Sequence, residues 1–272
     1  MENVKVLFIS QEITPYLPES EMSLIGRYLP QGIQEKGKEI RTFMPRFGNI
    51  NERRNQLHEV IRLSGMNLII DDTDHPLIIK VASIQSARMQ VYFIDNEDYF
   101  NRKFVLKDNK NKFFRDNDER MIFFARGVIE TVKKLRWSPD IIHCHGWFTS
   151  LVPLYIKKSF SDDPLFMHSK VVFSAYNEGF NDTLEDNFVR KVKFDGISDS
   201  TLANLKKPTF AGLAELAFKY SDGIIMGSQT LPSEISNVLK ESKIPVLKYQ
   251  DPEDYIDSYS VFYDKILTEE KK

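Results

Sequence analysis

Short apolar runs alternate with amphipathic stretches along most of this 272-residue chain, and this alternation restricts the fold more than any other feature. The runs are rich in β-branched residues and flanked by turn formers, which is typical of strands. They span residues 4–10, 39–45, 77–83, 89–95, 139–145, 170–176 and 222–228. Helical periodicity occupies about residues 22–37, 116–136, 148–158, 209–220, 231–241 and 252–268. Such alternation predicts right-handed βαβ units and a Rossmann-like parallel sheet with helices on both faces.

Polar residues stand where several of these predicted strands end. They are Ser10, Glu12, His143, His145, Tyr176, Asn177 and Ser228. In an open parallel sheet the ligand crevice lies beyond the carboxyl ends of the strands. We therefore expect a functional site to draw on these residues.

Three stretches depart from the βαβ pattern. Residues 57–95 hold strand-like runs separated by polar turns, which predicts a small β-rich insertion or a pair of hairpins. Residues 100–115 and 177–207 are polar with little periodicity, so we expect long surface loops there. Nothing resembling a linker divides the chain, and residues 1–272 are therefore expected to form a single domain.

Composition excludes several classes of function. A net charge of -2 gives no general attraction to nucleic acid or to an anionic membrane. The basic stretch 102–115 also contains Asp108, so a solvated loop is favoured there over nucleic-acid contact. No apolar run approaches the roughly 20 residues of a membrane span, and the chain starts without a signal-peptide pattern. These observations predict a cytoplasmic protein without a membrane segment.

The sequence His143-Cys144-His145 superficially suggests a metal site or a nucleophile. In a strand, residues 143 and 145 share one face and residue 144 points to the other. No second pair of ligands follows, and Cys144, the single cysteine, is expected to face the core. We therefore predict no metal and no cysteine chemistry.

Five collinear segments resemble the family of bacterial glycogen synthases and plant starch synthases. Residues 139–147, PDIIHCHGW, are similar to the family segment PDxxHxHDW, and residues 116–130, DNDERMIFFARGVIE, resemble its DNxxRFxFFSxAxxE helix. Residues 93–102, 173–177 and 216–235 resemble its YFxR turn, its FTxHN strand end and its ADxITTVSPTYAxEI segment. These matches extend over most of residues 4–240 and are jointly far more specific than any one motif.

The resemblance implies a GT-B glycosyltransferase, in which two Rossmann-like domains face each other across a cleft. Such enzymes transfer glucose from ADP-glucose to an α-1,4-glucan with retention of configuration, and they need no metal or other cofactor. Residues 1–272 correspond to the N-terminal half, so we expect the second GT-B domain to be absent. Residues 252–268 are then expected to form the helix that closes back on the N-terminal domain, or else an ordinary terminal helix.

The loop after the first strand departs from the family pattern ExxPxxKxGGLADVxGxLP. Residues 12–30 keep its frame, but they carry Pro18 in place of the lysine, Ser20 and Glu21 in place of the glycines, and Leu24 in place of the aspartate. Carboxylates repel a diphosphate, whereas glycines and a lysine would hold one. The alternative role of this loop is to start a helix, with Ser20 as its cap.

Three other positions are candidates for substrate binding because of the resemblance. The second histidine of the family's HxHDW segment reaches the transferred glucose, which makes His145 a candidate, although Gly146 replaces the aspartate. Asp116 matches an aspartate near the sugars, and Asn177 is kept where Tyr176 replaces a histidine. The alternatives are a buried polar group at a strand end for His145 and a helix cap at Asp116 or Asn117, with Arg120 pairing one turn later.

Two functions remain open from the sequence. The first is a synthase-like glycosyltransferase domain that is inactive alone, because its donor loop is altered and its second domain is missing. The second is a non-catalytic role, in which the chain binds α-glucan or regulates a full-length synthase. A third reading is a working enzyme completed by a separate chain.

Overall fold

A computed structural model describes residues 3–193 and 196–269. Its strands are β1 (Lys5–Ser10), β2 (Glu39–Pro45), β3 (His58–Glu59), β4 (Met66–Ile70), β5 (Thr73–Ile84), β6 (Met89–Asp95), β7 (Ile141–His145), β8 (Lys170–Ala175), β9 (Gly223–Met226) and β10 (Val246–Leu247). Its α-helices are α1 (Glu21–Glu35), α2 (Glu97–Phe100), α3 (Asn117–Leu135), α4 (Leu151–Lys158), α5 (Phe188–Val192), α6 (Phe210–Lys219), α7 (Ser233–Glu241) and α8 (Tyr255–Thr268). Short 3-10 helices lie at Gln85–Ala87, Trp147–Thr149 and Ala203–Leu205.

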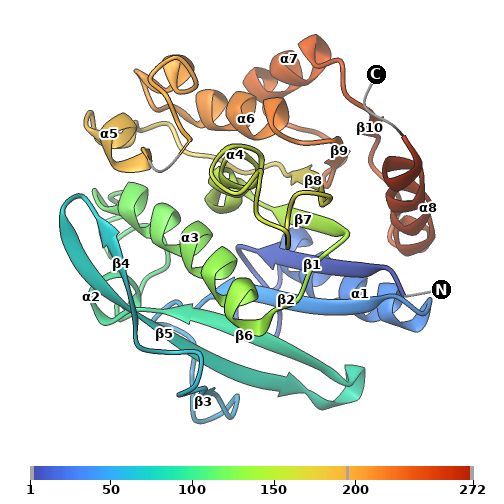
Figure 1. The fold of residues 1–272 in the computed structure, drawn as a ribbon, viewed down its shortest axis with the longest axis horizontal. Coiled ribbons are helices and arrows are strands. Elements are labelled where there is room, and N and C mark those ends of the chain that lie inside the picture. The colour runs from blue at the N-terminus through green and yellow to red at the C-terminus, as the bar shows by residue number, and fades with distance from the viewer. Residues whose placement is uncertain (1–2, 194–195, 270–272) are drawn as a thin grey trace.

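The strands form one mixed sheet in the order β10–β9–β8–β7–β1–β2–β6–β5–β3, with β4 paired to β5 (Figure 1). Every neighbouring pair from β10 to β6 is parallel. Strands β3, β4 and β5 are antiparallel additions at one edge. The predicted Rossmann-like parallel sheet is therefore confirmed.

The β-rich segment holds the predicted pair of hairpins. Strands β4 and β5 form one antiparallel hairpin, and β5 and β6 form the other. Strand β6 also pairs with β2 and so belongs to the parallel sheet. Val91, Phe93 and Ile94 on this strand are completely buried, because both of its faces are covered.

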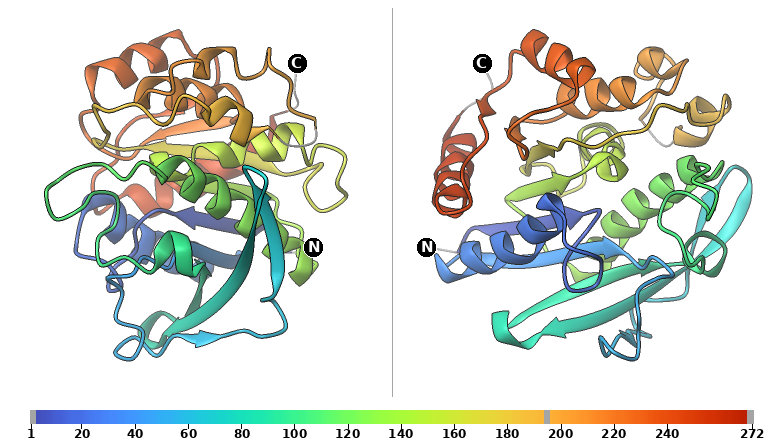
Figure 2. Two further views of the ribbon diagram at one scale, coloured as in Figure 1. Left: turned by 90° about the vertical axis from the view of Figure 1, so that its left-hand side faces the viewer. Right: turned by 180° about the vertical axis from the view of Figure 1, so that it is seen from behind.

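Helices cover both faces of the sheet because the strands alternate their apolar residues between two cores. On β1, Leu7 and Ile9 belong to the larger core, which α3, α4 and α6 complete. Val6 and Phe8 belong to the smaller core, which α1 and α8 complete. Figure 2 shows α1 and α8 side by side on the face of the sheet opposite α3.

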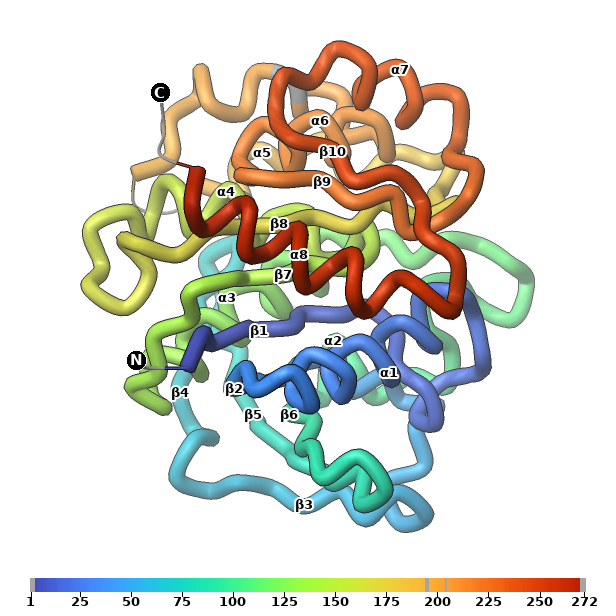
Figure 3. Tube along the Cα trace, turned by 90° about the vertical axis from the view of Figure 1, so that its right-hand side faces the viewer, coloured from blue at the N-terminus to red at the C-terminus, as the bar shows by residue number. Residues whose placement is uncertain are grey.

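Helix α8 closes the smaller core at the end of the described chain. It buries Tyr259, Phe262, Tyr263 and Ile266 against residues of β1, β7, β8 and β9. Figure 3 shows α8 running across these strands next to α1. The aromatic stripe in the sequence thus predicts this packing, since Tyr259, Phe262 and Tyr263 all point inward. None of the described helices combines the length and hydropathy that crossing a membrane requires.

Candidate functional site

The connections of the sheet reverse direction at β1. The chain leaves β1 toward β2 on one side, and β7 lies on the other side. In sheets of this kind the crevice for a ligand opens between the two strands at this point, outside their carboxyl ends. Here those ends are joined by a hydrogen bond from Gln11 N to His145 O of 3.1 Å. The loops after β1 and β7 therefore form the candidate site.

Gln11 and Glu178 fill the crevice between these loops. The Gln11 amide donates to Glu178 Oε2 at 3.3 Å, and its Oε1 accepts from Phe148 N at 3.1 Å. Glu178 Oε1 accepts from Trp147 N at 2.7 Å. Burial, with a smaller contribution from the charge of Glu12, raises the pKa of Glu178 to about 8. The crevice thus holds a carboxyl group of the chain itself, protonated at neutral pH.

Ser20 caps α1, as the sequence predicts. Its Oγ accepts from Ser23 N at 3.0 Å, and Ser20 N donates to Ser23 Oγ at 2.7 Å, which makes a capping box. The Ser20 hydroxyl also donates to Glu12 Oε2 at 2.8 Å. Pro18 is exposed and its carbonyl accepts from Ser23 Oγ at 3.1 Å. The polar groups of the loop therefore form hydrogen bonds within the loop and with the first turn of α1.

Glu21 reaches from the first turn of α1 to the loop after β9. Its Oε2 accepts a hydrogen bond from Ser228 Oγ, which in turn accepts from Asn177 N at 2.9 Å. The backbone of Asn177 thereby joins the loop after β8 to this bridge. Asn177 itself is exposed to solvent. Since a helix N-terminus attracts negative charge, Glu21 occupies the place where α1 would otherwise favour an anion.

His145 lies beneath this surface and is only 1% exposed. Its Nδ1 is 2.7 Å from the Tyr176 hydroxyl, and its ring centroid is 3.8 Å from that of His143. Burial lowers the pKa of His145 to about 3, so the imidazole is neutral at physiological pH. Among the described residues its Nε2 has no hydrogen-bond partner. At 1% exposure His145 offers almost no surface to a sugar hydroxyl in this conformation.

Two glycines close to His145 lie against neighbouring side chains. Gly146 has φ +85°, and a Cβ there would lie 2.8 Å from Met22 and 3.1 Å from Gln11 Oε1. A Cβ at Gly227 would lie 2.5 Å from the Tyr176 ring. An aspartate at position 146 would thus have a strained backbone, and the end of the Met22 side chain would have to shift to accommodate it.

His143 links the sheet to α8. Its Nδ1 is 2.6 Å from the Tyr263 hydroxyl, and its Nε2 is 2.7 Å from Ser174 Oγ. Burial lowers the pKa of His143 well below its usual value. Cys144 faces the larger core and is completely buried, as expected. Within the described residues, His, Cys, Asp and Glu side chains nowhere gather in a set of three that could hold a metal ion.

Asp116 belongs to the support of the loop 100–115. Its carboxylate forms an ion pair with Arg102, and its side chain makes no capping bond to α3. The capping role expected for Asp116 or Asn117 is therefore wrong: Asn117 instead donates to the Leu106 carbonyl at 2.9 Å. The predicted pairing of Arg120 is confirmed, since its guanidinium donates to Asn117 Oδ1 at 2.5 Å.

An open groove lies beside the bridge between Glu21 and Ser228, along the outer side of α1. We call it the tyrosine groove, and its volume is about 660 Å³. Its principal residues are Glu21, Leu24, Tyr28, Tyr249, Gln250 and Tyr255. The groove lies where α8 meets α1. The two helices pack closely at Gly32, where an added Cβ would lie only 2.6 Å from the Ile256 side chain. Leu24 gives this wall an apolar residue.

The tyrosine groove is a feature that the sequence interpretation missed. Tyr28 is 49% exposed although it lies on a helix that packs on the sheet, and Tyr249 precedes α8. The aromatic residues before and within α8 predict an apolar stripe on this helix. They do not predict that Tyr255 faces α1. The available signal was Tyr28 itself, an aromatic residue on the polar side of an amphipathic helix.

Comparisons with known proteins agree with this arrangement. The model of the starch synthase catalytic domain matches residues 5–243. The glycogen synthases of Chlorobium limicola and Chlorobaculum tepidum are each 39% identical over 176 residues, which is 64% of this chain and 36% of each relative. The matched region thus spans about a third of the length of these relatives.

A solved structure shows the same fold. The catalytic domain of starch synthase IV from Arabidopsis thaliana, bound to ADP and acarbose, superposes with a TM-score of 0.70 at 16% identity. The superposition covers 93% of this chain and 53% of that one.

Proposed function

Because this chain belongs to the starch synthase catalytic-domain family, we propose that it is a synthase-type domain that binds α-glucan and does not itself transfer glucose. The observation that carries the proposal is the bridge from Glu21 to Ser228. It closes the end of α1 where a sugar nucleotide would need an open anion site, and it leaves the tyrosine groove open beside it.

Donor binding is disfavoured by charge and by space. Glu12 and Glu21 are held near the N-terminus of α1 by Ser20 and Ser228, so their carboxylates stay where a diphosphate would lie. Each like-charge contact costs about 1 kcal/mol or more near a protein surface. Met22 also lies against Gly146, and the Tyr176 hydroxyl lies 2.7 Å from His145 Nδ1. The 272-residue chain is therefore expected to bind ADP-glucose weakly and to lack turnover.

Glucan binding is supported by the chemistry of the tyrosine groove. The apolar faces of a sugar pack on aromatic rings, and its hydroxyls need a few polar partners. Tyr28, Tyr249 and Tyr255 supply rings, while Glu21 and Gln250 supply a carboxylate and an amide. A volume of about 660 Å³ suits a short oligosaccharide segment. Among the solved relatives, the Arabidopsis domain was bound to the pseudo-oligosaccharide acarbose.

We propose further that residues 1–272 act as one domain in the cytoplasm. The support for one unit is the smaller core, which joins the first strand to α8 through Phe8 and Tyr263. We propose that α8 corresponds to the helix that closes a GT-B protein onto its N-terminal domain. Its packing across β1, β7, β8 and β9 fits that role.

An amylopectin pull-down tests the glucan proposal. Wild type should be retained on the resin and released by maltoheptaose. The double variant Tyr28→Ala/Tyr249→Ala should lose at least tenfold in affinity, because two of the three rings disappear. Phe104→Ala is the matched control: Phe104 is 45% exposed but lies outside the groove, and this variant should bind like wild type.

Other outcomes separate the alternatives. If only Phe104→Ala lost glucan binding, the glucan site would lie outside the tyrosine groove. Absence of glucan binding by wild type would refute the proposal and favour a chain that regulates a full-length synthase. ADP-glucose turnover by the purified chain would show a working enzyme.

A further inference from the structure

Several lysines surround a hollow at the opposite edge of the sheet from the candidate site. Lys170 begins β8, Asp222 precedes β9, and Lys243 precedes β10, so the hollow lies at the amino ends of these strands. Its volume is about 560 Å³. We call it the lysine pocket; its cationic residues are Lys157, Lys158, Lys170, Lys219 and Lys243.

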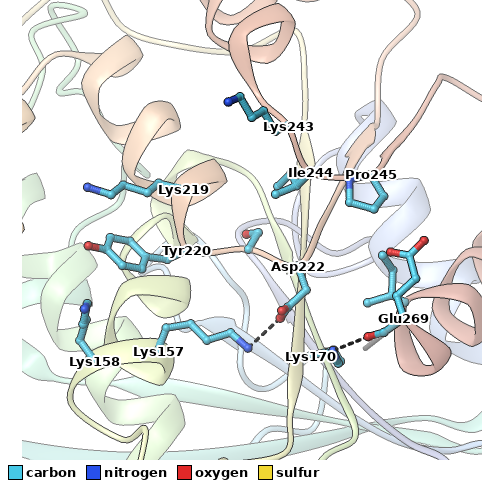
Figure 4. Close-up of a pocket in the computed structure, with 12 residues that line it drawn as sticks. Lys157, Lys158, Lys170, Lys219, Tyr220, Asp222, Lys243, Ile244, Pro245 and Glu269 are labelled. Atoms are coloured by element: carbon cyan, nitrogen blue, oxygen red, sulfur yellow. Dashed lines mark hydrogen bonds and ion pairs between the residues drawn. The ribbon is translucent and has the colours of Figure 1, made fainter. Parts of the chain in front are cut away.

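Two of these lysines already have partners in the fold. Lys157 pairs with Asp222 at 2.7 Å, and Lys170 Nζ donates to the Glu269 carbonyl at 3.0 Å (Figure 4). These contacts fix the floor of the pocket. Lys157 is also largely shielded from solvent, with 18% of its side chain exposed.

The other three lysines, Lys158, Lys219 and Lys243, are exposed. Within the described residues no ion pair joins any of them to a carboxylate. Figure 4 shows Lys158 and Lys219 on either side of Tyr220, whose ring lies 5.8 Å from Lys158 Nζ and 5.5 Å from Lys219 Nζ. An aromatic wall flanked by two ammonium groups is thereby available to a ligand.

The charge balance of the pocket is positive even after the helix ends are counted. The five lysines face the carboxylates of Asp222 and Glu269, which leaves three positive charges. Lysines in the last turns of α4 and α6 also neutralise helix C-termini, which together contribute about one negative charge. Lys170 donates to the carbonyl of Glu269, the C-cap residue of α8, so a third helix end contributes about half a negative charge more. Lys243 lies outside any helix. About one and a half positive charges remain for a ligand.

We infer that the lysine pocket binds a small molecule that carries a diphosphate or two phosphate groups. Ammonium groups from α4, α6 and the α7–β10 loop suit several phosphate oxygens at once. The Tyr220 ring and the side chains of Ile244 and Pro245 offer an apolar surface to the rest of such a molecule. The inference is independent of the glucan proposal, because it uses the opposite edge of the sheet.

Calorimetric titration with inorganic pyrophosphate tests this site in the full chain. Wild type should bind one equivalent, with an affinity that falls as salt rises. The triple variant Lys158→Ala/Lys219→Ala/Lys243→Ala should bind at least about tenfold more weakly. The control removes the same charge from an exposed loop: Lys103→Ala/Lys107→Ala/Lys110→Ala should bind like wild type. All substituted lysines are exposed. The pocket variant should have a slightly lower Tm than wild type, because Lys158 and Lys219 neutralise helix C-termini, so far-UV circular dichroism verifies that both variants are folded before the titration.

Three results would overturn the inference. The first is no saturable heat when pyrophosphate is titrated into wild type. The second is an equal loss of pyrophosphate affinity in both triple variants, which would mean general attraction to positive charge. Flotation with phosphatidylcholine vesicles containing phosphatidylinositol phosphate distinguishes a lipid source of the same chemistry. Binding to those vesicles without binding to pyrophosphate would refute a small-molecule site.

Discussion

The carboxylate of Glu21 accepts a hydrogen bond from the hydroxyl of Ser228, although 207 positions separate the two residues. The contact joins the first turn of α1 to the loop after β9 across the carboxyl edge of the sheet. It also holds a carboxylate at the N-terminus of α1, where the helix dipole favours negative charge. This pair therefore stabilises the contact between α1 and the loop after β9.

Removing the Glu21 carboxylate should weaken the fold slightly. We expect Glu21→Ala to lower the free energy of unfolding by about 1 kcal/mol, because a charged hydrogen bond and a favourable helix-dipole contact disappear. Urea denaturation measures this change. Glu19→Ala removes an exposed carboxylate just before the cap and should change stability by less than about 0.5 kcal/mol. Equal losses in both variants would show that the bridge does not contribute.

His145 should make the protein sensitive to acid. Its pKa is lowered to about 3 by burial, so the unfolded chain takes up a proton near pH 6.5 while the folded chain does not. Stability contributed by the neutral imidazole is therefore lost as pH falls below about 6.5. Between pH 7.5 and pH 5, wild type should lose about 2 kcal/mol more than His145→Gln. The exposed His168→Gln variant should follow wild type, and a pH profile of His145→Gln parallel to wild type would contradict the burial argument.

Glu178 should have the opposite effect at higher pH. Its pKa is raised to about 8, mainly by burial, so its contribution is complete below the pKa of an unfolded glutamate and is lost as pH rises toward 8. Between pH 6 and pH 9, wild type should lose about 2 kcal/mol more than Glu178→Gln, which keeps the shape without the charge. Urea unfolding at the two pH values gives the comparison. Glu97 is exposed, so Glu97→Gln should lose as much unfolding free energy between the two pH values as wild type. If Glu178→Gln also lost as much as wild type, a group other than Glu178 would be responsible for the pH dependence.

Helix α8 should be essential to the domain. Phe262 is 5% exposed and contacts the sheet near Gly223, whereas Val261 on the same helix is 69% exposed. Phe262→Ala should lower the free energy of unfolding by about 3 kcal/mol, because it leaves a cavity in the smaller core. Val261→Ala should cost less than about 0.5 kcal/mol. Equal stability of the two variants would mean that α8 docks only loosely.

Local pattern accounts for most of the fold. The strand runs and helix periods predict the longer elements, because apolar spacing reports which face of each element is buried. The short helices α2 and α5 were not predicted, and α5 lies within residues 177–207, which were expected to be a surface loop. Ser20 could be identified as a cap for the same reason, since capping depends on residues three positions apart. The sequence does not specify that β6 pairs antiparallel with β5 and parallel with β2, because both pairings leave the same apolar pattern in a single strand.

Contacts between distant residues account for what the sequence did not predict. The tyrosine groove requires Tyr28 and Tyr255 to meet, and no local pattern specifies the angle at which α8 crosses α1. Asp116 was expected to cap α3, but Arg102 holds its carboxylate in an ion pair. The position of His145 at a strand end could be predicted. Its contact with the Tyr176 hydroxyl could not, because that contact depends on how the end of β8 lies next to β7.

The central claim is that this chain binds glucan but not the sugar nucleotide. Calorimetric titration of the purified chain with maltoheptaose and, separately, with ADP-glucose tests it most directly. We predict saturable heat with maltoheptaose and none with ADP-glucose at millimolar concentration. Tight binding of ADP-glucose, with glucose appearing on added glucan, would contradict the claim.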